Sequence, residues 1–306
     1  MVEFQLSSGE DFREGIIRIA TGLNTDACNH LRRRVNIHES VHNARVCFKK
    51  IRAVLRLLRS EIGEVAYHAE NAFYRDTSRR LSFLRDYTAS IEAIEELEKT
   101  RRSPETLSLL NSWKRRLQLK RAALLRETRT EELFTGIIEQ TEAARARMTA
   151  WRFEHDAGSI LRRAISRAYG SGKKTKLLLN KSADDHLMHE WRKDTKYMMY
   201  MMQMLRSLWP PVINAFTREL NLLSDYQGRH HDLCVLSGQL SHLKPGKKHH
   251  EATIRGIKAG IRNKKKQLTN DALALGSNIY AMKPAEAGKL FREWWKASGS
   301  GQKLQS

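Results

Sequence analysis

Proline and glycine are scarce in this chain, which has 5 Pro and 17 Gly in 306 residues. An all-β domain needs frequent turns, and these turns rely on the two scarce residues, so the composition excludes an all-β fold. No run of eighteen apolar residues occurs, which excludes a membrane-spanning helix. The first residues are acidic rather than apolar, so we expect no signal peptide.

Cysteine is also rare. Cys28, Cys47 and Cys234 are an odd number of widely spaced thiols, so they predict no disulfide framework and fit a reducing compartment. Cys47 and Cys234 stand in apolar stretches, where we expect small buried side chains. These features favour a cytoplasmic protein.

Acidic residues are too few to balance the basic ones. The chain has 34 Asp and Glu against 55 Lys and Arg, which gives a formal net charge of +21 at pH 7. A field of this sign attracts polyanions, so the composition favours an acidic partner. At 41% hydrophobic residues the chain is long enough to bury a sizeable core, which excludes global disorder.

Most of the sequence has apolar residues three and four positions apart, which is typical of helices. Ser103-Pro104 predicts the start of a helix, and Pro210-Pro211 predicts the end of one helix and the start of the next. The glycines and lysines of 170–183 predict a linker, and 298–306 predicts a flexible tail. Helices are expected over 10–34, 37–62, 65–100, 104–151, 155–169, 184–209, 211–242 and 247–276.

The chain contains an internal repeat with an offset of 147 residues. His42, Arg45, Lys49 and Arg59 are matched by His189, Arg192, Lys196 and Arg206, and Asp86 is matched by Asp232 at an offset of 146. We therefore predict an all-α domain over 10–295, made of two pseudo-symmetric helical bundles around a basic central groove. Repeat 1 would span 10–169 and repeat 2 would span 184–295.

A basic stripe runs along the expected helix 37–62. It contains His38, His42, Arg45, Lys49, Arg52, Arg56 and Arg59, whose spacing of three and four places them on one helical face. Between Leu31 and Ser60 there are nine Lys or Arg and one acid, Glu39. Like charges this close repel each other, so the stripe favours a bound anion. The matching helix 184–209 also has an apolar stripe rich in Met, which we interpret as core.

The spacing of the stripe bears on the kind of anion. One cation every three or four residues, at a rise of 1.5 Å, gives one about every 5 Å along each helix. Arg offers forked hydrogen bonds to phosphate oxygens, Lys a point charge, and His a ring donor. Two such helices facing each other suit a linear or clustered phosphate polymer better than a small anion.

These motifs resemble the CHAD family, the conserved-histidine α-helical domain. The resemblance is carried by HNARVCFKKIRAVLRLLR, FLRDY, HEWRKDTKYMMYMM and GRHHDL, and it covers residues 10–295. It implies two helical bundles that bind inorganic polyphosphate in a basic groove, without catalysis or cofactor, in association with polyphosphate granules. It further implies that Asp86 and Asp232 orient neighbouring donors.

The resemblance also implies a set of binding residues. The chain departs from the family at Met199, where Arg is common, and at Gln203, where an acid is usual, so the second half of the groove is expected to bind more weakly. The implied polyphosphate contacts are His42, Arg45, Lys49, Lys50, Arg52, Arg56, Arg85, His189, Arg192, Lys193, Lys196, Tyr200 and His231.

Two other functions compete with polyphosphate binding. Nucleic acid would also suit a basic protein, although no known nucleic-acid-binding motif is visible. A metal-dependent phosphohydrolase is disfavoured, because no catalytic set or carboxylate cluster emerges. His38-Glu39-Ser40-Val41-His42 has the HExxH pattern of zinc proteases but lacks its continuation. His230-His231 and His249-His250 could bind a transition metal, but with no Cys or carboxylate at ligand spacing to complete a site we favour polar surface or groove histidines.

Overall fold

A computed structural model describes residues 2–33, 36–100, 103–127, 129–182, 184–241 and 248–299. All regular secondary structure in these ranges is helical, as predicted, and none of the helices described is long and apolar enough to cross a membrane. The α-helices are α1 (Phe12–Arg33), α2 (Ile37–Leu57), α3 (Arg59–Ile62), α4 (Glu64–Arg80), α5 (Ser82–Thr100), α6 (Pro104–Glu127), α7 (Thr130–Thr149), α8 (Ala157–Lys181), α9 (Asp185–Met204), α10 (Pro210–Ser241), α11 (Lys248–Ile279) and α12 (Pro284–Ala297), with a 3₁₀ turn η1 (Arg206–Leu208).

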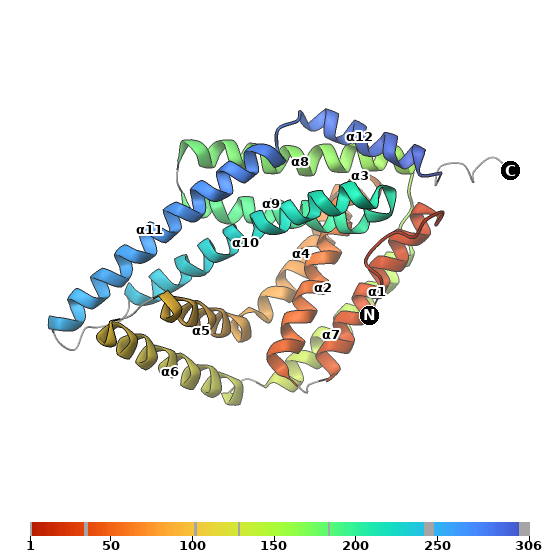
Figure 1. The fold of residues 1–306 in the computed structure, drawn as a ribbon. Coiled ribbons are helices and arrows are strands. Elements are labelled where there is room, and N and C mark those ends of the chain that lie inside the picture. Colours follow the sequence, from red (N-terminus) through yellow and green to blue (C-terminus); the bar gives the residue numbers. More distant parts are fainter. Residues whose placement is uncertain are drawn as a thin grey trace.

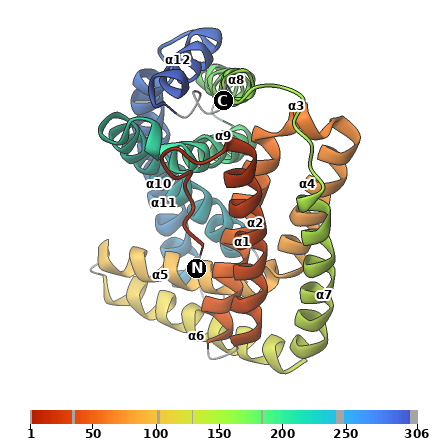
Figure 2. The ribbon, with the colours of Figure 1, turned by 90° about the vertical axis from the view of Figure 1, so that its right-hand side faces the viewer.

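The helices form three groups (Figures 1 and 2). Helices α1, α2, α4 and α7 lie nearly side by side, with α1 packed against α2 and α7. Helices α8, α9, α10 and α12 pack across one end of this group, where α2 meets α9. Helices α5 and α6 lie at the other end and contact α10 and α11. Helix α10 therefore connects the second and third groups.

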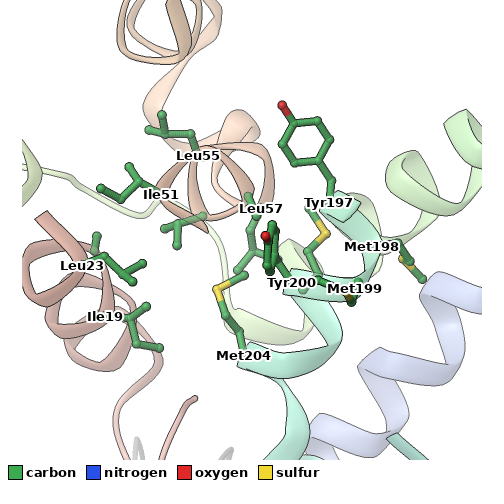
Figure 3. Close-up of a cluster of buried hydrophobic side chains, with 14 of the residues drawn as sticks. Ile19, Leu23, Ile51, Leu55, Leu57, Tyr197, Met198, Met199, Tyr200 and Met204 are labelled. Atoms are coloured by element: carbon green, nitrogen blue, oxygen red, sulfur yellow. The ribbon is translucent and has the colours of Figure 1, made fainter. Parts of the chain in front are cut away.

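The larger core lies where α1, α2 and α9 meet (Figure 3). Ile19 and Leu23 of α1 face Ile51 and Leu55 of α2, and the methionines of α9 fill the space beyond. Met198, Met199, Met201, Met202 and Met204 are all 3% exposed or less. The prediction that this methionine stripe is core is confirmed, and Met199 is part of the packing.

A second, smaller core joins α5, α6, α10 and α11. Ile94, Trp113, Leu236 and Ile261 are among its buried residues. Near it, the Gln239 side chain donates to Ser90 Oγ at 2.8 Å and links α10 to α5. This core keeps the C-terminal part of α10, which follows His231, close to α5 and α6.

Helices α2 and α9 end in the same way. Helix α2 ends before Leu58 (φ −88°, ψ 4°), and α9 ends before Leu205 (φ −95°, ψ 10°). Each of these residues is buried and donates its amide to the carbonyl four residues earlier. The two positions differ by 147 residues, the offset found in the sequence.

The predicted linker at 170–183 is wrong, because α8 continues to Lys181 without a break. Gly170 and Gly172 allow close packing rather than flexibility. A Cβ on Gly172 would overlap the hydroxyl of Tyr280, and one on Gly170 would contact Pro284 at 3.5 Å. Lys173 also donates to the Met282 carbonyl at 2.7 Å. These tertiary contacts outweigh the low helix propensity of glycine.

Two helix starts were predicted correctly from proline. Helix α6 begins at Pro104, where Ser103 Oγ accepts a hydrogen bond from the Thr106 amide at 3.4 Å. Helix α10 begins at Pro210. Other expected helices are divided: 37–62 into α2 and α3, 65–100 into α4 and α5, and 104–151 into α6 and α7. The predicted tail lies outside the described residues from Ser300 on.

Candidate anion-binding site

Two arginines at equivalent positions of α2 and α9 are anchored in the same way. Arg45 Nη1 donates to the carbonyl of Ser78 at 2.9 Å, and Arg192 Nη1 donates to the carbonyl of Ser224 at 2.6 Å. Ser78 lies on α4 and Ser224 on α10. Each bond fixes a guanidinium group against the backbone of a neighbouring helix.

Glycine makes room for one of these anchors. A Cβ on Gly228 of α10 would lie 2.9 Å from Nη1 of Arg192. The guanidinium of Arg192 therefore rests against the backbone of α10. Only glycine gives this clearance without a shift of the arginine.

Each anchored arginine has an aspartate within electrostatic reach. Asp86 interacts with Arg45, and Asp232 interacts with Arg192. Burial raises the pKa of Asp86, although Arg45 opposes this rise. This proximity is compatible with an orienting role for the two aspartates, which stays a prediction.

Two histidines of the site lie next to each other, near Arg192. The rings of His189 on α9 and His231 on α10 are 4.8 Å apart, centroid to centroid, with 34° between their planes. Burial, followed by the charges of Arg192 and Lys49, lowers the pKa of His231. Burial, followed by His231 and Lys193, lowers the pKa of His189.

These contacts define a central basic cluster drawn from α2, α9 and α10. Lys49 belongs to it because its charge acts on His231. Lys196 belongs to it because the charge of Arg192 acts on Lys196. Burial, followed by the charge of Arg192, lowers the pKa of Lys196. Lys49 is exposed and the other members are half-buried. An anion stabilises partly buried cations that repel each other, because it replaces lost solvation and offsets the repulsion. The central basic cluster consists of Arg45, Lys49, His189, Arg192, Lys196 and His231.

Arg52 and Arg56 lie further along α2, against the ring of Tyr197. Their guanidinium carbons are 5.6 and 3.8 Å from its centroid, respectively, within the range of cation–π interactions. Arg52 Nε also donates to Asn71 Oδ1 at 2.9 Å. We call Arg52 and Arg56 the stacked-arginine pair. Arg56 and Tyr197 line a cavity of about 110 Å³ together with Arg59, Tyr67 and Arg167.

Three of the predicted contacts are engaged elsewhere. Lys50 Nζ lies 4.4 Å from the ring centroid of Phe4, on another face of α2 from Lys49. Lys193 forms an ion pair with Glu190, one turn earlier on α9. Tyr200 is 6% exposed and packs edge-on against Phe4, and burial raises its pKa to about 12.

Two further predicted contacts are only partly defined. His42 is exposed on the first half of α2, one turn before Arg45. Arg85 belongs to α5, but its side chain lies outside the described part of the chain. The structure therefore brings six of the thirteen predicted residues into the central basic cluster.

Sequence reasoning missed the groups that hold the arginines. The carbonyls of Ser78 and Ser224 leave no mark in a residue pattern, since every residue has a carbonyl. Gly228 is the first residue of the motif GRHHDL, and its position before the two histidines is the one sign in the sequence of close packing there. Tyr197 could have been recognised as an aromatic residue beside the polar stripe of α9.

The expectation that nothing completes a metal site beside His230 is wrong. Cys234 follows His230 by one helical turn on α10, and its Sγ lies 3.6 Å from His230 Nδ1. Asp185 of α9 approaches the other ring nitrogen, Nε2, at 3.5 Å. The ligand-type atoms of these three residues all lie within 4.8 Å of one another. The HExxH residues belong to no such group among the described residues.

Comparison with known proteins identifies the family. The family model described as the CHAD domain matches residues 24–241, so the chain belongs to the CHAD domain family. A crystal structure of the CHAD domain from the plant Ricinus communis is similar with a TM-score of 0.61 and 17% sequence identity. The alignment covers 92% of this chain and 94% of that chain, which shows a shared fold. No curated protein matches the chain.

Proposed function

We propose that this protein binds inorganic polyphosphate at the central basic cluster and does so without catalysis. The observation that carries the proposal is the pair of anchored arginines, Arg45 and Arg192. Their guanidinium groups are fixed by backbone carbonyls on two different helices. Arg192 acts on His189 and His231, and Lys49, one turn after Arg45 on α2, acts on the same His231. Preorganised donors of this kind bind phosphate oxygens with little loss of side-chain entropy.

The length of the basic surface favours a polymer over a single phosphate. Along α2, the distance from Arg45 to Arg56 is about 16 Å at 1.5 Å per residue. The stacked-arginine pair lies at the far end of this span, where Tyr197 holds it in place. We infer that a polyphosphate chain contacts the central basic cluster and extends toward this pair.

We also propose that the two halves of the site arose by duplication of one helical unit. The support is threefold: the anchored arginines, the neighbouring aspartates, and the helix ends at Leu58 and Leu205 all recur at offsets of 146 or 147 residues. The halves differ at Met199, which is buried at the position that corresponds to Arg52. The second half therefore supplies fewer cations, and we expect it to contribute less to affinity.

A competition experiment tests the proposal. The protein is saturated with labelled long-chain polyphosphate at moderate salt and then challenged with duplex DNA or ATP at equal phosphate concentration. We expect neither competitor to displace the label by more than a small fraction. Displacement by DNA would favour the nucleic-acid alternative and contradict the proposal. Release of orthophosphate during the incubation would contradict its non-catalytic part.

A further inference from the structure

A second site of different chemistry lies where the first turn of α9 meets α10. Asp185, His230 and Cys234 bring a carboxylate, an imidazole and a thiol together, with one atom from each within 4.8 Å of the others. His230 and Cys234 are one helical turn apart and therefore share a face of α10. None of the three residues belongs to the central basic cluster.

The donor set points to a particular class of cation. Imidazole nitrogen, thiolate sulfur and carboxylate oxygen are the ligands of tetrahedral Zn²⁺, whereas Ca²⁺ and Mg²⁺ prefer oxygen alone. Ligand atoms in a tetrahedral zinc site are roughly 3.3 to 3.8 Å apart, from metal–ligand distances of about 2.0 to 2.3 Å. The 3.5 Å separation of Asp185 Oδ1 and His230 Nε2 already fits this range. Cys234 Sγ lies 3.6 Å from the other ring nitrogen, Nδ1, so binding of one ion by all three residues requires the thiol to turn toward the ion.

A positive charge already occupies the neighbourhood. The ammonium group of Lys265, on α11, lies 2.5 Å from Asp185 Oδ2 and also interacts with Cys234. His230 is 4% exposed, so the ammonium group of Lys265 lies at the border of a buried imidazole. The ammonium group of Lys265 is therefore the cation now paired with Asp185, and it competes with any metal ion for the same carboxylate.

We propose that Asp185, His230 and Cys234 bind a zinc-type divalent cation, with a water as the fourth ligand, when Lys265 withdraws. On binding, the thiol of Cys234 loses its proton to solvent and a metal–sulfur bond forms. The bound ion links the start of α9 to α10, the two helices that carry His189 and His231. This inference does not depend on polyphosphate binding.

Metal titration of the full-length, tag-free and polyphosphate-free protein tests the proposal. Co²⁺ serves as a spectroscopic probe, because thiolate ligation gives a near-ultraviolet charge-transfer band. Zn²⁺ affinity is measured by competition with a chromophoric chelator. We expect one equivalent of either metal, a charge-transfer band in the wild type, and loss of that band in Cys234→Ser with Zn²⁺ binding weakened about tenfold or more.

Two further variants make the result specific. Lys265→Met removes the competing ammonium and should tighten Zn²⁺ binding severalfold, an effect that damage to the fold would not produce. Cys28→Ser replaces a thiol outside the site, which is 1% exposed where Cys234 is half-buried, and should retain the band. Circular dichroism confirms helicity for each variant. A wild type without the band, a band that survives in Cys234→Ser, or weaker binding in Lys265→Met would overturn the proposal.

Discussion

At the residue scale, His189 is the group best placed to make anion binding sensitive to pH. Burial, and then the charges of His231, Lys193 and Arg192, lower its pKa, while Glu190 acts in the opposite direction. Its Nδ1 is buried and has no hydrogen-bond partner among the described residues. A phosphate oxygen beside the ring would favour the imidazolium and raise this pKa.

The sign of the effect follows from these two pKa values. The free protein has a His189 pKa below the ordinary 6.5, and a bound phosphate should raise it, so we expect binding to take up protons at pH values between the two. Polyphosphate affinity should rise as the pH falls through the pKa of the complex and level off below that of the free protein. Calorimetry in two buffers of different protonation enthalpy measures the uptake.

Replacing His189 shows how much of the proton uptake this side chain contributes. His189→Asn should take up fewer protons on binding than the wild type at the same pH. His68→Asn, on the exposed surface of α4, is the control and should behave like the wild type. Equal proton uptake by His189→Asn and the wild type would show that His189 does not face the ligand.

At the element scale, α10 positions Arg192 through a glycine. A Cβ at Gly228 would lie 2.9 Å from the guanidinium, and the end of a flexible side chain yields more easily than a backbone. Gly228→Ala should therefore displace Arg192 from the Ser224 carbonyl without changing the charge of the protein. We expect polyphosphate binding to weaken about threefold or more while the fold is retained.

A matched substitution on the same helix serves as the control. Nothing lies within 4 Å of a Cβ at Gly238, so Gly238→Ala gains helix propensity and leaves the site untouched. Fluorescence titration with labelled polyphosphate compares the two variants. If Gly228→Ala binds as tightly as Gly238→Ala, the position of Arg192 has no bearing on affinity.

Helix α8 provides a test of packing. Gly172→Ala would force its Cβ into the Tyr280 hydroxyl and should lower the free energy of unfolding by about 1 to 3 kcal/mol. Gly136→Ala in α7 meets nothing within 4 Å and should raise it by about 0.5 to 1 kcal/mol. Urea unfolding measures both. A stabilised Gly172→Ala would mean that 170–181 packs less closely than described.

At the scale of the whole molecule, the sequence predicted those features that depend on the spacing of residues close together in the chain. The all-helical fold, the helix starts at Pro104 and Pro210, and the buried methionine stripe of α9 follow from spacing and turn chemistry alone. The helical period also placed Arg45 and Lys49 on one face of α2, and the repeat placed Arg192 at the matching position of α9.

What the sequence missed depends on contacts between distant segments. Gly172 is helical because Tyr280 packs on it, and that partner lies more than a hundred residues away. Lys50 follows Lys49 directly, so the two side chains diverge by about 100° around α2, and Lys50 meets Phe4 instead. Cys234, one helical turn after His230, was available to sequence reasoning and was overlooked, whereas Asp185 comes from another helix and could not be found by spacing along one segment.

The most direct test of the central claim removes both anchored arginines. The double variant Arg45→Ala/Arg192→Ala is compared with Arg32→Ala/Arg129→Ala, which loses the same charge from exposed positions. The polyphosphate dissociation constant is measured at fixed ionic strength, with circular dichroism to confirm helicity. We predict that the first variant binds about tenfold or more weakly and that the control stays within about twofold of the wild type. Equal losses in the two variants would mean that net charge alone attracts the polymer and would contradict a defined site.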